Sequence, residues 1–282
     1  MGKIVVIGSI NMDIATELSE MPQIGETVKG NAAVISPGGK GANQAVAAAK
    51  LGGDVMMVGM IGNDAFGADA LANLNSVCID VTHVRSIDAT TGLAMILRER
   101  GDNRIIVAPG ANHAWPSDLP LTEIISEASI VLLQNEIPFP IIEKVVDIAA
   151  RYHVPTIFDP APVDHFPVSF LRKITYLTPN ESESKQLPDD MLHGKTEALL
   201  VTLGKEGVQL CLPHEKVTIP AVLVDVKDST GAGDTFNGAF AVAITSGKSL
   251  QEAVRFANKA AAISTTKIGA QSGMPILTDI ES

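Results

Sequence analysis

The residues with the clearest chemical potential lie in the segment 228–238, whose sequence is DSTGAGDTFNG. Gly231, Ala232 and Gly233 come directly before Asp234, and an apolar run typical of a helix follows. Backbone N–H groups at the start of a helix lack partners within it and, with the helix dipole, can bind an anion. A carboxylate there can take a proton from a hydroxyl group while the N–H groups hold the phosphate that the hydroxyl attacks. The alternative is a helix that merely begins with an acidic turn.

Two polar residues, Asn11 and Asp13, stand at the end of the apolar run 4–10. Ligands bind at the carboxyl ends of parallel strands, and an extended chain places alternate residues on the same side. A carboxylate can accept hydrogens from two neighbouring hydroxyl groups, and an amide can both donate and accept. The pair therefore predicts a sugar site, and the alternative is an Asx turn that leaves the strand.

Other segments supply polar groups that a phosphate or a nucleotide could use. The loop 38–43, GGKGAN, places one cation and one amide at the start of a predicted helix. Asn180 and Glu183 begin another predicted helix and can reach phosphate oxygens and hydrated Mg²⁺ together, although helix capping is the alternative. Residues 202–207, TLGKEG, either approach a nucleotide closely or make a tight hairpin turn.

Composition limits the class of protein. The chain has 282 residues, of which 46% are hydrophobic, and a formal net charge of −11. This length suits one α/β domain, and the negative charge argues against nucleic-acid binding, which relies on Lys and Arg. No apolar segment is long enough to cross a membrane. Cys78 and Cys211 are far apart and no secretion signal is visible, which predicts reduced thiols in a cytoplasmic protein.

Short apolar runs alternate with helical patterns along the chain. The runs predict strands buried on both faces at residues 4–10, 55–61, 130–134, 156–158, 175–178 and 198–203. Helices are predicted at residues 43–51, 64–74 and 141–152, and a capping box at Ser249 and Glu252 begins another that runs to about residue 263. This alternation predicts a mostly parallel central sheet with helices on both faces.

Two segments do not fit that alternation. Residues 13–37 and 89–109 alternate apolar and polar positions and contain turn signals at Gly25, Gly30 and 101–103. They predict a small β-sheet outside the main layer, which serves as a lid over the site, as a dimer surface, or as both.

In this order, the segments SINMD, GGKGANQAVAA, TPNESE, TLGKEG and DSTGAGDTFNGA resemble the ribokinase-like (PfkB) carbohydrate kinases. The resemblance runs from the first strand to about Gly273. It implies one α/β kinase domain over residues 1–282 with a β lid, and a homodimer that pairs through the lid. It also implies ATP-dependent phosphorylation of the primary hydroxyl of a pentose, D-ribose at O5, with Mg²⁺ and K⁺ as activating ions.

Other acceptors within this family are 2-deoxyribose, a nucleoside or a ketohexose. A sugar sensor without catalytic activity, built on the same fold, would need the sugar-binding residues but neither Asp234 nor the glycine run. Both are present.

The resemblance also implies roles for individual residues. Asp234 would be the catalytic base, and Gly231, Ala232 and Gly233 would form the anion hole around the transferred phosphoryl group. The implied sugar-binding residues are Asn11, Asp13, Gly39, Lys40, Asn43 and Glu136. The implied ATP-binding residues are Asn180, Thr202, Leu203, Gly204, Lys205, Glu206, Gly207, Gly233 and Asn258. Glu183 would hold Mg²⁺ through water, and the implied potassium ligands are Asp228, Thr230, Ser264, Lys267 and Gly269.

The chain departs from the family pattern at two places. A serine that ends the potassium loop in the family corresponds to Gly273 here, next to Ser272. The connection 184–198 is also short, which leaves little chain to support the adenine side of an ATP site.

Overall fold

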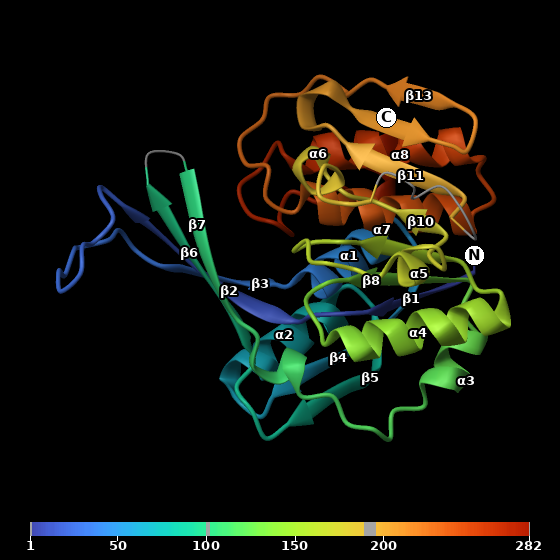
Figure 1. Ribbon diagram of the computed structural model, residues 1–282. Helices are drawn as coiled ribbons and strands as arrows, with labels where there is room; N and C mark the ends of the chain where they lie inside the picture. The colour runs from blue at the N-terminus through green and yellow to red at the C-terminus, as the bar shows by residue number, and fades with distance from the viewer. Residues whose placement is uncertain (1, 100–101, 189–195, 282) are drawn as a thin grey trace.

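The computed structural model describes residues 2–99, 102–188 and 196–281 (Figure 1). The connection 184–198 therefore lies partly outside the described residues. The strands of the main sheet are β1 (Lys3–Ile7), β4 (Asp54–Gly62), β5 (Asp80–Ile87), β8 (Ile130–Gln134), β9 (Thr156–Asp159), β10 (Tyr176–Leu177), β11 (Ala198–Thr202), β12 (Val208–Cys211) and β13 (Lys216–Ile219). Their order across the sheet is β13-β12-β11-β10-β9-β8-β1-β4-β5. Neighbours from β5 to β11 are parallel, and β12 and β13 are added antiparallel.

Helices cover both faces of this sheet (Figure 1). They are α1 (Lys40–Lys50), α2 (Ala65–Ser76), α3 (Leu121–Ser126), α4 (Phe139–Tyr152), α5 (Val168–Leu171), α6 (Glu181–Ser184), α7 (Ala232–Thr245), α8 (Leu250–Ser264) and α9 (Leu277–Glu281). On β1, Ile4 and Val6 pack into the core formed with α1, α7 and α8, while Val5 and Ile7 pack into the core formed with α3 and α4. Because both faces are buried, the strand is apolar from Ile4 to Ile7, as expected from the sequence.

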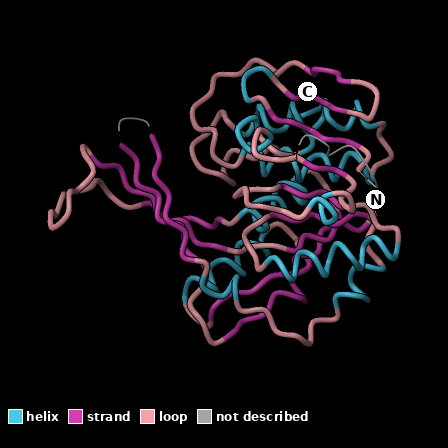
Figure 2. Tube along the Cα trace, in the orientation of Figure 1, coloured by secondary structure: helices cyan, strands magenta, loops and turns pink. Residues whose placement is uncertain are grey.

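A second, smaller sheet projects from the main body (Figure 2). Its strands are β2 (Asn11–Leu18), β3 (Val34–Gly38), β6 (Gly92–Glu99) and β7 (Asp102–Ala108), in the order β3-β2-β6-β7. β2 and β6 are parallel, and β3 and β7 pair with them antiparallel. The predicted α/β class with a small β-sheet is confirmed, and we call this small sheet the lid sheet below.

The predicted strand at residues 4–10 is wrong at its end. β1 stops at Ile7, and Asn11 begins β2 in the lid sheet, so Asn11 and Asp13 belong to that sheet and not to the first strand. The reason lies far along the chain, because the side chain of Asn112 binds both backbone groups of Ile10. Its Oδ1 accepts from the Ile10 N–H at 2.9 Å and its Nδ2 donates to the Ile10 carbonyl at 3.2 Å. These two hydrogen bonds satisfy the backbone groups of Ile10 that a neighbouring strand would otherwise pair with, so the chain can leave the main sheet here.

None of the helices in the part of the chain that the structure describes combines the length and hydrophobicity of a membrane span.

Candidate active site

Asp234 lies in the first turn of α7, as the sequence predicts. Gly231 precedes the helix with φ 77°, and a Cβ placed on it would lie 2.9 Å from the Ala270 backbone, so this position requires glycine. A Cβ placed on Gly233 would have no neighbour within 4 Å. The first turn of α7 is therefore tightly packed at Gly231 and open at Gly233, where a ligand can approach the free N–H groups.

The carboxylate of Asp234 is buried and held by two amides. Asn43 Nδ2 donates to Oδ2 at 2.9 Å, and Gln44 Nε2 donates to Oδ1 at 3.3 Å. Burial, together with the charge of Glu136, raises the pKa of Asp234, and the charge of Lys40 and these two hydrogen bonds only partly oppose the rise. A carboxylate with a raised pKa is a stronger base than an exposed one.

The start of α1 supplies a cation between acidic groups. Lys40 Nζ lies 3.4 Å from Asp159 Oδ2, and the Lys40 backbone N–H donates to Glu136 Oε2 at 3.0 Å. Burial acts to lower the pKa of Lys40, but Asp159, Asp234 and Glu136 outweigh it and raise the pKa above its usual range. The lysine is therefore a fixed positive charge near Asp234 and Asp159, where it can stabilise negative charge on a bound group.

The predicted sugar residues are brought together beside Asp234. Burial, and then the charges of Glu136 and Asp234, raise the pKa of Asp13 to about 6, so the three carboxyl groups interact electrostatically. A Cβ placed on Gly38 would lie 2.2 Å from Asp13 Oδ1, and one placed on Gly92 would lie 2.2 Å from Asn11 Oδ1. The neighbouring strands β3 and β6 thus make room for these two side chains through glycine.

Gly39 closes the same region from the side of α1. Its φ is 87°, and a Cβ placed there would lie 2.7 Å from the Asn11 backbone nitrogen. Glu136 follows β8 and also accepts a short hydrogen bond from Ser9 Oγ. The structure therefore brings the six residues predicted to bind sugar into one region beside Asp234.

Four contributors to this region were not predicted from the sequence. Asn112 Nδ2 donates to Asn11 Oδ1 at 2.7 Å and so orients the Asn11 amide. Gln44 Nε2 also donates to Asp159 Oδ2 at 3.2 Å, and Gln134 Nε2 donates to Gln44 Oε1 at 2.7 Å. For Gln44 and Gln134 the signal available in the sequence was their polarity, since Gln44 interrupts an apolar helix and Gln134 ends an apolar strand.

Asp159 ends β9 at the same edge of the main sheet as the other acids. Burial, Asp234 and Glu183 raise its pKa to about 7, although Lys40 opposes them. Its place at the carboxyl end of a parallel strand was the signal that could have identified it. The result is a group of acids around one lysine, in which Asp159 and Asp234 are buried.

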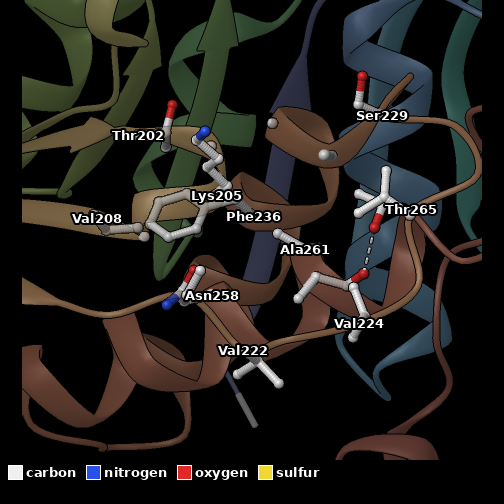
Figure 3. A pocket seen from close by; sticks show the side chains of 17 residues that line it. Thr202, Lys205, Val208, Val222, Val224, Ser229, Phe236, Asn258, Ala261 and Thr265 are labelled. Carbon is white, nitrogen blue, oxygen red and sulfur yellow. Dashed lines mark hydrogen bonds between the residues drawn. The ribbon is translucent and has the colours of Figure 1, made fainter.

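A cavity of about 320 Å³ adjoins the open first turn of α7. Its walls come from β11, the turn after it, the loop 221–229, α7 and α8. Figure 3 shows Val208 beside the ring of Phe236, with Val222 and Val224 across the space. An apolar slot of this size suits a flat ring such as a nucleotide base.

Six of the predicted ATP residues line this cavity, namely Thr202, Gly204, Lys205, Gly207, Gly233 and Asn258. Leu203 and Glu206 belong to the same turn but are not among the lining residues. The 3₁₀ turn Gly204–Glu206 leads directly into antiparallel β12, so the segment is both a hairpin turn and a cavity wall.

Asn180 and Glu183 form a capping box at the start of α6, which is the alternative raised by their spacing. Asn180 Oδ1 accepts from the Glu183 N–H at 2.9 Å, and Glu183 Oε2 accepts from the Asn180 N–H at 2.8 Å. The charge of Glu183 nevertheless acts on Lys40 and Asp159. Glu183 therefore caps a helix at the border of the acidic group.

The carboxylate of Asp228 organises the loop before α7. Its Oδ1 accepts from the Thr230 N–H at 2.9 Å and the Thr230 hydroxyl at 2.6 Å, and its Oδ2 accepts from the Gly269 N–H at 3.0 Å. These bonds, together with Arg98, hold the pKa of Asp228 below its ordinary value despite burial. Two segments predicted to share a cation, 228–230 and 264–269, are thus joined directly.

The end of that loop has no room for a side chain at residue 273. A Cβ placed on Gly273 would lie 2.0 Å from the carbonyl oxygen of Ser264, which is fully buried. Lys267 is exposed on the intervening turn. The departure noted at Gly273 is therefore built into the local packing.

Comparisons with known proteins agree with this geometry. The family model described as pfkB family carbohydrate kinase matches residues 1–277. A ribokinase of Lactococcus lactis is 41% identical over 100% of this chain and 97% of the relative, and one of Bacillus subtilis is 40% identical over 100% and 99%.

Two solved structures are similar over nearly the whole chain. The ribokinase of Thermotoga maritima has a TM-score of 0.92 and 38% identity, with 100% of this chain and 98% of that chain covered. The ribokinase of Arabidopsis thaliana, solved with ribose and ATP, has a TM-score of 0.91 and 36% identity, with 99% and 97% covered. The chain therefore belongs to the pfkB family of carbohydrate kinases.

Proposed function

We propose that the protein transfers the terminal phosphoryl group of ATP to the primary hydroxyl of D-ribose, giving D-ribose 5-phosphate. The observation that carries the proposal is the position of Asp234. It stands between the group of sugar-type residues and the apolar cavity, directly after Gly233, which lines that cavity. Ribokinases 40% and 41% identical over the whole chain, and a plant ribokinase solved with ribose and ATP, support the choice of sugar.

The reaction needs little covalent chemistry from the protein. Asp234 takes the proton from O5, a bond forms between O5 and the γ-phosphorus, and the bond from that phosphorus to the bridging oxygen of ADP breaks. The N–H groups in the first turn of α7 and the ammonium group of Lys40 stabilise the charge of the transferred group. Asp13 and Asn11 hold neighbouring hydroxyls and thereby aim O5 at the base.

The acidic group fits Mg²⁺ bound with a nucleotide. Within the described residues no three acidic, His or Cys side chains gather as a metal-binding group. Mg²⁺ characteristically keeps several waters and uses one or two carboxylates together with phosphate oxygens. Glu183 and Asp159 are suited to that role, with Asn180 beside the phosphates. The ion would neutralise charge on the phosphate oxygens.

The joined loops 228–230 and 264–269 fit K⁺, which prefers several oxygen ligands. Asp228, Thr230 and the backbone carbonyls of Ser264, Lys267 and Gly269 are the groups that would hold it. Gly273 contributes no side-chain oxygen, so the site relies on carbonyls and on Asp228. An ion there would act on the loop that leads into Gly231 and Asp234.

We also propose that two copies pair through the lid sheet and that the protein is cytoplasmic. The lid sheet exposes apolar side chains whose exposed fractions are 62% for Val34, 54% for Ile35, 56% for Ile105 and 54% for Ile106. Ile35 and Ile106 lie in one cross-strand row with Ile14 and Met95, so these four side chains share one face of the sheet. An exposed apolar face of this kind is typical of an interface. The cytoplasmic location is supported by Cys78 and Cys211, which are both free.

An assay of ADP release with a panel of acceptors tests the reaction. D-Ribose should give the highest kcat/KM, ahead of 2-deoxyribose, fructose and adenosine; 2-deoxyribose belongs in the panel because a Salmonella typhimurium deoxyribokinase is 32% identical. Asp234→Asn should lower kcat by about 10²–10⁴-fold. ADP release that is equal with and without every sugar, or an Asp234→Asn variant as active as the parent, would overturn the proposal.

A further inference from the structure

A chain of three amide side chains ends at the catalytic carboxylate. Asn73 Nδ2 on α2 donates to Gln271 Oε1 at 2.8 Å. Gln271 Nε2 donates to Asn43 Oδ1 at 2.9 Å, and Asn43 Nδ2 donates to Asp234 Oδ2 at 2.9 Å. The chain thus links α2, the loop after α8, α1 and α7, which are distant in sequence.

The direction of every bond in this chain follows from its last member. An ionised carboxylate can only accept hydrogen bonds, so Asn43 must turn its NH₂ group toward Asp234. The Asn43 oxygen then faces Gln271, which must present its own NH₂ group, and the Gln271 oxygen in turn faces Asn73. No amide in the chain can rotate by 180° without placing two oxygens or two NH₂ groups against each other.

Gln271 is itself held at both ends. Lys50 Nζ donates to its backbone carbonyl at 2.7 Å, and Asn73 fixes its side-chain oxygen. It lies two residues after Gly269, whose N–H binds Asp228. The loop that carries the proposed cation site is therefore connected to Asp234 through the side chains of Gln271 and Asn43.

We propose that Gln271 is a positioning residue for phosphoryl transfer, because it fixes the Asn43 amide in the orientation that holds and aims Asp234. This inference rests on the proposed sugar kinase activity. Gln271 touches neither the reacting atoms nor the apolar cavity, and its effect passes through Asn43 alone. A misaimed base should lower kcat while the affinity for ATP stays the same.

Two substitutions of Gln271 separate positioning from packing. Gln271→Glu keeps the size of the side chain and an acceptor for Asn73, but it cannot donate to Asn43 and draws the Asn43 NH₂ group away from Asp234. Gln271→Met removes the polar contacts without reversing any of them. Positioning predicts that Gln271→Glu is the more damaging variant, with kcat lowered by about 10–100-fold and the KM for ATP within about twofold. If Gln271 only packed against its neighbours, Gln271→Met should lower kcat more than Gln271→Glu.

Thermal unfolding gives a readout that does not depend on activity. Gln271→Glu should lower the Tm by about 2–4 °C. This loss should disappear in an Asp234→Asn background, because an asparagine can present its oxygen or its NH₂ group and so accepts either direction of the chain. Ser76→Glu is the charge control, since Ser76 and Gln271 line a second cavity, separate from the apolar one, and Ser76 donates to the Asn73 backbone carbonyl and not to Gln271. Its shift in Tm should be equal in both backgrounds.

The outcomes separate the two proposals. Parent protein that phosphorylates no sugar would refute the proposed function, and the Tm cycle would still test the amide chain. Active parent protein with a Gln271→Glu variant of equal kcat, or with Gln271→Met as the slower variant, would overturn the positioning role. A Tm loss that persists unchanged in the Asp234→Asn background would overturn it as well.

Discussion

Arg98 of the lid sheet reaches the carboxylate of Asp228, with Nη2 3.5 Å from Oδ2. The same oxygen accepts the Gly269 N–H. Arg98 follows Ala94 and Ile96 on one face of β6, because alternate residues of a strand point the same way, and both of those residues are buried. The inner face of the lid sheet therefore contacts the loop that leads to Asp234.

Arg98→Gln should loosen the lid sheet with little loss of global stability. The side chains are 31% and 12% exposed, and partly exposed ion pairs contribute about 1 kcal/mol or less. Hydrogen exchange in β6 and β7 should become faster, and high salt should have the same effect on the parent protein. Arg104→Gln is the matched control, because Arg104 pairs with Glu99 inside the lid sheet. Equal exchange in parent and Arg98→Gln proteins would show that the ion pair does not hold the lid sheet.

The affinity for ribose should decrease as the pH is lowered through the pKa of Asp13, which is raised to about 6. The ionised carboxylate can accept two hydroxyl hydrogens, and protonation removes part of that capacity. Calorimetry between pH 5 and pH 8 should show weaker ribose binding below pH 6 in the parent. The Asp13→Asn variant should bind ribose more weakly than the parent over this whole pH range, with a loss of roughly 2–5 kcal/mol in binding free energy. Its affinity should no longer depend on pH. The same pH curve in both proteins would remove Asp13 from the sugar site.

Asp13→Asn should also stabilise the sugar-free protein at alkaline pH. A folded-state pKa raised from 3.8 to about 6 means that ionised Asp13 opposes folding. That penalty is complete above pH 6 and fades as pH falls toward the ordinary pKa. At pH 8 the variant should gain roughly 1–3 kcal/mol, and near pH 4 the two proteins should unfold alike. Denaturant titration at the two pH values measures the difference, and a gain of equal size at both would contradict the assignment.

The fold could be predicted from the sequence where the cause was local. Apolar runs such as 130–134 are buried on both faces whatever surrounds them, so β8 begins and ends where expected. The end of β1 could not be predicted, because the bonds that release the chain there come from Asn112, 102 residues away.

The residues of the candidate site also divide into those that a local sequence pattern identifies and those that depend on distant contacts. Asp234 and Gly231 are recognisable because the helix start and the positive φ are properties of one short segment. Gln271 could not be recognised, since its partner Asn43 is 228 residues away. Nothing in the segment GAQSG indicates that the glutamine side chain has a specific hydrogen-bond partner. Asp159 required knowledge of which strand ends meet at one edge, and that is a property of the whole sheet.

The reaction should be faster in K⁺ than in Na⁺ or a large organic cation at equal ionic strength. The ion would fix the carbonyls near Thr230 and Ser264 and so the directions of the N–H groups before Asp234. Asp228→Asn should reduce the preference. Gly273→Ser should lower stability and activity instead of strengthening the cation site, because a Cβ there would lie 2.0 Å from the Ser264 carbonyl oxygen. Rates that do not depend on the monovalent cation would limit this loop to a structural role.

Ribose should close the lid sheet over the site. β2 carries both Asn11 and Asp13, so a sugar bound to them ties this strand to α1 and α7, where Asn43 and Asp234 complete the site. Closure would exclude water, which competes with O5 for the phosphoryl group. Hydrogen exchange with and without ribose should therefore slow in β2, β3, β6 and β7, while α4 on the far face stays unchanged and serves as the internal control. If the lid sheet is instead a permanent dimer surface, its exchange will be slow in both states and will quicken only in a variant such as Ile106→Glu, which places a charge on the exposed apolar face.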